Sequence, residues 1–517
     1  MTDLRLPPID FAALAPILIL FGTAALGVLV EAFVPRRWRH PVQFIAGLLG
    51  LVAAFVAVVK QAGTRTVTAG TAIAVDGPTL FLQGTILVLA VVALLLIAER
   101  KLEHGGPFVA QASIPASSEA DRYQRAQRDA STEFYPLTMF AVAGMLIFVA
   151  ANDLLTMFVA LEVFSLPLYL LCALARRRRL LSQEAAMKYF LLGAYASAFF
   201  LFGVALTYGF AGAVDFAAIH AGVSNSSASP VLLLAGLAML AIGLLFKVAA
   251  APFHVWAPDV YQGAPTPITA FMAACTKVAA FGALLRVLYV AFEGAGWDFT
   301  PVIGGVAVLT MLVGAILAVT QTDIKRLLAY SSVANAGYLL VGVLALSKDG
   351  LSSTMFYLVA YGFSVIAAFG IVTLVRDGDG EATHLSRWAG LGRRSPLYAG
   401  LFTFVLLAFA GIPLTSGFTS KFAVFGAAWA GGQTWLVIAG VVSSMILAFP
   451  YLRVVVLMWL SEPGDATPSV SVPGVLTGMA VVIGVVATLV LGVAPEALLN
   501  LTDSASEFVR SSGSAMP

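Results

Sequence analysis

The sequence predicts a polytopic, all-α membrane protein of about fourteen transmembrane helices. Of its 517 residues, 60% are hydrophobic and only 11% are charged, and the mean hydropathy is +0.95. One bilayer crossing needs roughly 20 consecutive apolar residues, so this composition suffices for about fourteen crossings. It excludes a soluble enzyme, a nucleic-acid-binding protein and a disordered chain. The apolar runs are uninterrupted, which also excludes the polar–apolar alternation of a transmembrane barrel.

Polar breaks divide the apolar runs into fourteen predicted spans. These are 11–34, 42–62, 79–99, 134–151, 153–175, 184–211, 230–262, 267–292, 301–321, 324–346, 351–376, 397–430, 435–460 and 472–494. They give five regions: helices 1–3 over 1–99, a polar cytoplasmic loop over 100–133, helices 4–8 over 134–292, helices 9–13 over 301–460, and helix 14 with the C-terminal tail over 472–517.

Lysine and arginine are distributed unevenly between the alternating loops. The set that begins with the loop after the first span holds eighteen of these cations, and the opposite set holds five. Cytoplasmic loops of membrane proteins carry the excess of cations. The first set is therefore predicted to be cytoplasmic, with both termini on the outer side.

Several ionisable residues lie inside predicted spans, where a charge near the bilayer centre costs at least about 2.5 kcal/mol. At 1.5 Å per residue, Glu162 and Lys277 lie roughly 13 and 15 Å deep. Such residues persist when they are buried and paired, usually where they act on ions. Lys188 lies only four residues inside its span, so its depth fits an interfacial anchor and a functional group equally well. Arg286 and Arg453 lie close enough to span ends to reach the interface, and both are predicted to be anchors.

Prolines interrupt the two longest spans beside a lysine in each. Span seven has Pro252 and Pro258 just after Lys247, and span twelve has Pro413 just before Lys421. Proline removes a backbone donor and breaks a helix, and unpaired backbone at membrane depth is tolerated only inside protein or beside a wet cavity. Spans seven and twelve are each the fourth of five, in 4–8 and 9–13. Two inverted five-helix repeats, each with a broken helix that carries a lysine, are therefore predicted.

Other polar residues in the spans have two possible roles. His254 is the only histidine inside a span, and a functional role and a satisfied loop histidine fit it equally well. Tyr330, Ser331, Asn335 and Tyr338 recur on one face of span ten, where they could order water or bind helices together. The two cysteines, Cys172 and Cys275, form no CxxC pattern, so no metal site and no cofactor is predicted in this chain.

Several long motifs resemble the antiporter-like membrane subunits of bacterial NADH–quinone oxidoreductase (respiratory complex I) and of Mrp antiporters. The motifs are ANDLLTMFVALEVFSLPLYLL, SQEAAMKYFLLGAYASAF, FKVAAAPFHVWAPDVYQGAPTPITAF, TKVAAFGALLRV and TDIKRLLAYSSVANAGY. The run FKxxxxPFHxWxPDxYxGAP is very specific to this family. The short C-terminal tail, Lys421 where relatives usually have glutamate, and the absence of lysine in FYLVAYGFSVIAAF favour the N-type subunit of complex I.

The resemblance implies a proton relay. Glu162 matches the family's acidic residue on helix five, paired with Lys247, and Lys188 matches the lysine of helix six. Lys277 matches the central residue on helix eight, and Lys421 the terminal group on helix twelve. His254 is counted with these relay residues, and the supporting residues are Lys325, Tyr330, Asn335, Tyr357 and Tyr361. Burial disfavours a lysine's charged form and a nearby carboxylate restores it, so opening a pair such as Glu162–Lys247 would release a proton.

The resemblance also implies the partners. The energy would come from NADH oxidation and quinone reduction, with NADH, FMN, iron–sulfur clusters and quinone bound by other subunits of the complex. The antiporter-like subunit M and the small subunit K would be the neighbours in a bacterial plasma membrane. The alternatives are a subunit of an Mrp-type cation/proton antiporter and a passive scaffold whose charges only pack helices.

Overall fold

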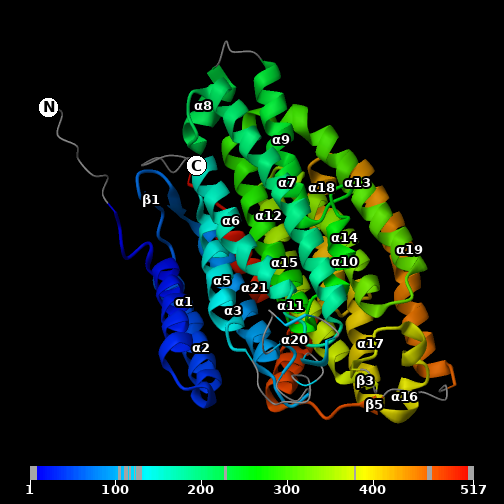
Figure 1. Ribbon diagram of the computed structural model, residues 1–517. Coiled ribbons are helices and arrows are strands. Elements are labelled where there is room, and N and C mark those ends of the chain that lie inside the picture. Colours follow the sequence, from blue (N-terminus) through cyan, green and yellow to red (C-terminus); the bar gives the residue numbers. More distant parts are fainter. Residues whose placement is uncertain are drawn as a thin grey trace.

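The computed structural model describes residues 9–102, 106–109, 114–115, 118–120, 123, 131–225, 230–377, 380–462 and 469–509. Over these residues the chain is a bundle of long helices with short strands at its ends (Figure 1). Eleven helices are long and apolar enough to cross a membrane. The chain is therefore a multi-pass membrane protein, as predicted. Most of the predicted loop 100–133 lies outside the described residues.

The first helices form a layer at one side of the bundle (Figure 1, blue). A short antiparallel hairpin joins the second and third helices. The elements are α1 (Ala15–Phe33), α2 (Arg36–Lys60), β1 (Thr66–Thr68), β2 (Ile73–Val75) and α3 (Gly77–Ala98).

The next region contains the first broken helix and a helix with two π-helical segments. Its elements are α5 (Phe134–Ala150), α6 (Leu154–Cys172), α7 (Arg179–Ala211), α8 (Phe216–Asn225), α9 (Pro230–Val248), α10 (Trp256–Gly263), α11 (Thr266–Phe271), η1 (Met272–Thr276), α12 (Lys277–Arg286) and η2 (Val287–Ala291). The last four, α11, η1, α12 and η2, are continuous and correspond to the eighth predicted span, so together they are called helix eight here. The most apolar window of helix eight is fully buried in the bundle.

The remaining elements include a second broken helix and a small three-stranded antiparallel sheet with strand order β4-β3-β5. They are η3 (Glu293–Ala295), α13 (Gly296–Thr320), α14 (Ile324–Val343), α15 (Lys348–Leu374), β3 (Val375–Asp377), β4 (Gly380–Glu381), η4 (Leu385–Trp388), α16 (Leu391–Arg394), α17 (Pro396–Ala410), α18 (Ser416–Ala430), α19 (Thr434–Leu460), β5 (Ser469–Val470), α20 (Val475–Val493) and α21 (Glu496–Ser504).

Each predicted span coincides with one helix or with one interrupted helix. The interruption between α9 and α10 contains Pro252, and the one between α17 and α18 contains Pro413. Gly411 ends α17 with φ +85°, a left-handed conformation that favours glycine. The two breaks therefore have the local causes that the sequence indicated.

Two helix–helix turns, one early and one late in the chain, have the same construction. Asp153 caps α6 and Asp323 caps α14, each through its side chain. Each turn also forms backbone hydrogen bonds with a segment farther along the chain. The first turn bonds to the segment after α7, and the second to the segment after α15. The bonds are Leu154 N to Val214 O (3.0 Å) and Phe216 N to Asn152 O (3.1 Å), and likewise Ile324 N to Thr383 O (2.7 Å) and Leu385 N to Thr322 O (2.7 Å). The first pairing lies beside α8 and the second beside β3, at opposite ends of the bundle (Figure 1).

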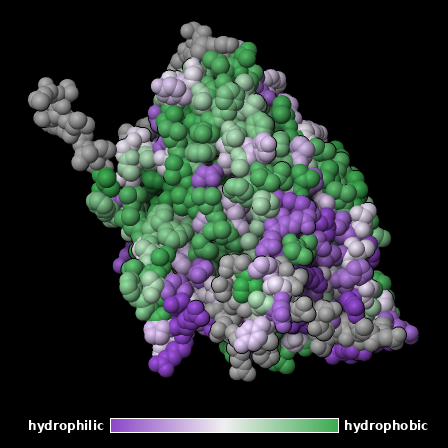
Figure 2. Space-filling view, in the orientation of Figure 1, coloured by the Kyte–Doolittle hydropathy of each residue, from purple (hydrophilic) through white to green (hydrophobic). Residues whose placement is uncertain are grey.

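The surface of the bundle agrees with a membrane setting. Hydrophobic side chains cover much of the visible face in Figure 2, and hydrophilic ones gather toward the end where α16 and β3 lie. A second hydrophilic patch lies over α10 and α14. α15 and helix eight, by contrast, are 94% and 100% buried over their apolar windows. They form the centre of the bundle and position the groups described next.

Candidate functional site

Lys247 lies in the last turn of α9, directly before the break, and only 5% of it is exposed. Its ammonium donates to Ser165 Oγ at 2.8 Å and to Tyr169 OH at 3.5 Å. Four aromatic rings surround the ammonium with centroids 5.4–5.7 Å away, and they belong to Phe164, Tyr169, Tyr189 and Phe246. Ring faces attract cations, so this cage favours the charged form of the lysine.

Glu162 is half-buried on α6, one helical turn before Ser165. Its carboxylate accepts a hydrogen bond from Ser197 Oγ on α7. No ion pair joins Glu162 to Lys247 in the described structure, because the ammonium bonds to Ser165 instead. The direct pairing of these two residues therefore stays a prediction.

Lys277 begins α12, immediately after the π-helical segment η1, and is 3% exposed. Its ammonium donates to Ser332 O at 2.6 Å and to Ser332 Oγ at 2.7 Å. The ring of Tyr361 lies 5.1 Å away. Because Ser332 is on α14 and Tyr361 on α15, this lysine joins helix eight to the later half of the chain.

Lys421 lies on α18 after the second break and is 6% exposed. It donates to Phe409 O at 3.0 Å, Ala410 O at 3.1 Å and Ser444 Oγ at 2.8 Å. The two carbonyls end α17, and a helix C-terminus carries partial negative charge. The ammonium therefore satisfies backbone groups that the break leaves free.

A small cavity of about 10 Å³ lies between Tyr361 and Lys421. Asn335, Tyr357 and Ser420 also line it. That volume is close to the least that holds one water molecule. Polar and ionisable groups therefore continue from the neighbourhood of Lys277 to Lys421 with room for about one water between them.

Lys188 lies on α7. It pairs with Glu184 at 2.7 Å and with Asp259 at 2.8 Å, and Asp259 also pairs with Arg326 at 2.6 Å. The Lys188 side chain is 43% exposed. Lys325, in contrast, is 3% exposed and donates to Ala264 O at 2.8 Å, at the end of α10.

The other predicted residues lie near the lysines. The His254 ring lies in the break of α9–α10, 6.3 Å from that of Tyr330, and His254 Nδ1 is buried without a hydrogen-bond partner in the described chain. Asn335 accepts from Tyr357 OH at 2.6 Å. The neighbouring polar residues of α14 bond directly to α19: Ser331 to Tyr451, and Tyr338 to Ser443.

The prediction for Arg286 is wrong. Arg286 is fully buried, and its Nη2 contacts both carboxylate oxygens of Asp76, at 2.7 and 2.8 Å. The sequence placed it near a span end, but the C-terminal segment covers that end, with Phe508 stacked 4.8 Å from the guanidinium. An interfacial anchor would reach water, and this residue does not.

Sequence reasoning missed the partners of the lysines. Ser165, Ser332 and Ser444 are among many hydroxyl residues in apolar helices, and backbone acceptors have no sequence signal. Asp259 could have been found, because it stands inside the motif PFHVWAPDVY. The described residues contain no group of three or more residues suited to a metal ion.

The comparisons decide the family. Residues 151–447 match the family described as NADH:quinone oxidoreductase/Mrp antiporter, TM. NADH-quinone oxidoreductase subunit N of Salinispora arenicola (strain CNS-205) is 75% identical, over 99% of this chain and 100% of that protein. The subunit of the same name from Rhodococcus opacus (strain B4) is 59% identical, over 98% and 97%. This chain belongs to the subunit N family of NADH–quinone oxidoreductases.

Solved structures agree with this family. A chain of respiratory complex I from Thermus thermophilus with bound aureothin is 31% identical, with a TM-score of 0.75 over 94% of this chain and 99% of that one. A chain of the Mrp complex from Dietzia sp. DQ12-45-1b has a TM-score of 0.80 over 96% and 97%, at 22% identity. The second likeness shows a shared fold. The resemblance stated from the motifs is confirmed for the subunit N family.

Proposed function

We propose that this chain is the proton-translocating subunit N of a bacterial NADH–quinone oxidoreductase, a translocase whose redox chemistry takes place in other subunits. The observation that carries the proposal is the succession of buried ammonium groups at Lys247, Lys277 and Lys421. Each is buried, and each bonds to hydroxyl or carbonyl oxygens beside a broken or π-helical segment. NADH, FMN, iron–sulfur clusters and quinone are assigned to partner subunits.

The proposed relay moves a proton by changing which buried lysine is charged. Glu162 and Ser165 lie one turn apart on α6, so a shift of the Lys247 ammonium toward the carboxylate needs movement of a side chain only. Closer approach stabilises the charged lysine, and withdrawal favours release of its proton. The proton then passes through Lys277 and a water in the cavity to Lys421, and His254 belongs to the same relay. The supporting residues are Lys325, Tyr330, Asn335, Tyr357 and Tyr361.

Lys188 is proposed to belong to the uptake side of this relay. It shares Asp259 with Arg326, so it connects α7, α10 and α14. The cluster is partly exposed, and Figure 2 shows a hydrophilic patch over α10 and α14, the helices that carry Asp259 and Arg326. A charged patch on a lipid-facing side is costly, which supports coverage by another membrane subunit. We assign the neighbours as subunits M and K.

We also propose fourteen crossings and an inverted repeat of helices 4–8 and 9–13. The domain division is that of the predicted regions 1–99, 100–133, 134–292, 301–460 and 472–517. Four isolated β-bridges support the predicted assignment of successive loops to opposite sides of the membrane, because each bridge joins two segments predicted to lie on the same side. The bridges are Ile73 with Ala151, Asp153 with Asp215, Phe108 with Ala175, and Asp323 with His384. The two matching turns at opposite ends of the bundle support the inversion. The end with α8 is assigned to the outside of a bacterial plasma membrane, with both termini.

Two lysine variants test the relay in the purified complex reconstituted into liposomes. We expect Lys247→Ala and Lys277→Ala to abolish most NADH-driven proton uptake, measured with an internal pH dye. Lys60→Ala is the matched control, because Lys60 is exposed at the end of α2. Full pumping with either core variant would overturn the relay. The Mrp alternative predicts instead that sodium or potassium drives proton flux without NADH.

A further inference from the structure

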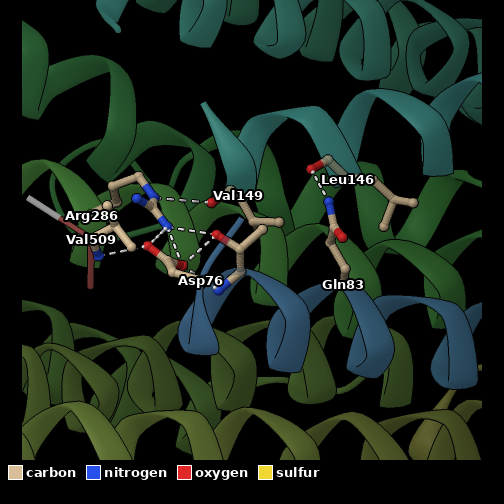
Figure 3. A network of polar contacts seen from close by, with 7 residues as sticks. Asp76, Gln83, Leu146, Val149, Arg286 and Val509 are labelled. Carbon is tan, nitrogen blue, oxygen red and sulfur yellow. Dashed lines mark hydrogen bonds and ion pairs between the residues drawn. The ribbon is translucent and has the colours of Figure 1, made fainter. Parts of the chain in front are cut away.

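The last described residues of the chain, Ala505–Val509, here called the C-terminal strap, lie on a buried ion pair. Asp76 caps the first turn of α3, and Arg286 ends α12. Both side chains have 0% exposure. Figure 3 shows the pair beside the backbone of Val509, whose amide donates to Asp76 Oδ2 at 3.0 Å. The strap thus contacts a charge pair contributed by segments more than two hundred residues apart.

The carboxylate of Asp76 has its hydrogen bonds filled on every side. It accepts from the backbone and hydroxyl of Thr79, at 3.0 and 2.7 Å, as well as from Arg286 and Val509. Arg286 Nε donates to Val149 O at 3.3 Å, and Phe508 covers the guanidinium face. A buried charge pair is tolerated only when such bonds replace water. The strap supplies both the last donor and the aromatic cover.

The strap contacts the end of helix eight, and α21, directly before the strap, contacts the start of α15. The Phe508 ring lies 6.3 Å from that of Tyr289 in η2 of helix eight. Just before the strap, Thr502 accepts from Ser352 Oγ at 2.9 Å, at the start of α15. Helix eight carries Lys277 and α15 carries Tyr361. The strap and α21 together therefore lie at the outer ends of the helices that hold the middle of the proposed relay.

We propose that the C-terminal strap and the Asp76–Arg286 pair form a seal that keeps outside water away from Lys277. Lys277 and Arg286 are nine residues apart in α12, about 13 Å. With the strap in place, a proton that leaves Lys277 toward the outer side meets the fully buried Asp76–Arg286 ion pair and the Phe508 ring that covers it. Its route continues toward Lys421. This inference rests on the proposed relay, because it states that the strap closes the path between Lys277 and the outer side of the membrane.

Gly77 offers a way to lift the strap without replacing Asp76 or Arg286. A Cβ at Gly77 would overlap the backbone of Ala505, which cannot yield like a flexible side chain. Gly77→Ala should therefore displace the strap. Gly84→Ala is the matched control on the same helix, since its Cβ would meet Phe55 and Val58 at ordinary distances of 3.6 and 3.8 Å.

Chain truncation gives a second, independent pair of variants, one that removes the strap and one that keeps it as a control. Ending the chain after Ser504 removes the strap, whereas ending it after Val509 keeps every contact described above. Phe508→Ala removes the aromatic cover of Arg286 and the ring contact with Tyr289, but it leaves the backbone bond from Val509 to Asp76. All variants are made in the intact complex, and their assembly is checked by the subunits that co-purify.

The measurement is passive proton flux into liposomes that contain the complex, without NADH, under a potassium diffusion potential set with valinomycin. We expect Gly77→Ala and the truncation after Ser504 to raise the flux several-fold, Phe508→Ala to raise it less, and both controls to match the parent. Unchanged flux in assembled strap variants would overturn the seal, and so would equal leaks in the controls. Failure of every strap variant to assemble would also overturn it, in favour of a folding role.

The result is separable from that of the relay. Lys277→Ala should lower NADH-driven pumping and leave passive flux low, because it does not touch the strap. A leak in the strap variants with normal pumping in Lys277→Ala would support the seal and contradict the relay. If the strap variants showed no leak and Lys277→Ala lost pumping, the relay would be supported and the seal contradicted.

Discussion

The two broken helices hold their lysines in different ways. Lys247 precedes its break, lies within an aromatic cage and bonds to Ser165, which is one turn from Glu162 on α6. Lys421 follows its break and binds the carbonyls that end α17. A carboxylate can gain or lose a proton and a side chain can move, whereas a helix end is a fixed partial charge. The difference indicates that the first site is the adjustable one and the second a fixed acceptor.

Loss of the Glu162 charge should have the largest effect, because only the first site depends on a carboxylate. We expect Glu162→Gln to lower NADH-driven proton uptake by at least about tenfold, the ratio that corresponds to 1.4 kcal/mol. Glu162→Asp should keep part of the activity. Glu133→Gln, an exposed carboxylate at the start of α5, is the control. Normal uptake with Glu162→Gln would remove the distinction between the two sites.

A side chain at Gly411 should damage the second site by an intermediate amount. Gly411 has φ +85°, and an added Cβ would lie 3.1 Å from Lys421 Cδ. The strained backbone alone costs about 1–2 kcal/mol, so Gly411→Ala should lower both the melting temperature and proton uptake. Gly400→Ala, also on α17, has open space at its Cβ and should change neither. An unaltered Gly411→Ala protein would show that the second site does not depend on the geometry of its break.

The helices could be predicted from the sequence because a bilayer requires long apolar segments and because proline marks the positions where they break. The positions of Lys247, Lys277 and Lys421 followed, because a charge inside such a segment is conspicuous. Their acceptors did not follow. Ser332 resembles any other serine of an apolar helix, and the carbonyls of Phe409 and Ala410 are present in every sequence. The Asp76–Arg286 pair was missed because its cover comes from Phe508 and Val509, at the far end of the chain.

The smallest expected effects come from removing single hydroxyl groups. They test whether the Lys247 and Lys421 sites really differ in how they hold the ammonium. Ser165 Oγ is the nearer of the two oxygen partners of Lys247, since Tyr169 lies at 3.5 Å. Ser444 Oγ is one of three partners of Lys421, and two carbonyls remain without it. A hydrogen bond to a charged group contributes roughly 1.5–3 kcal/mol, less where other acceptors can take over. Ser165→Ala should therefore reduce proton uptake more than Ser444→Ala, measured side by side in liposomes at equal complex content. If Ser444→Ala were the more harmful, the hydroxyl rather than the end of α17 would hold Lys421, and the second site would be as adjustable as the first.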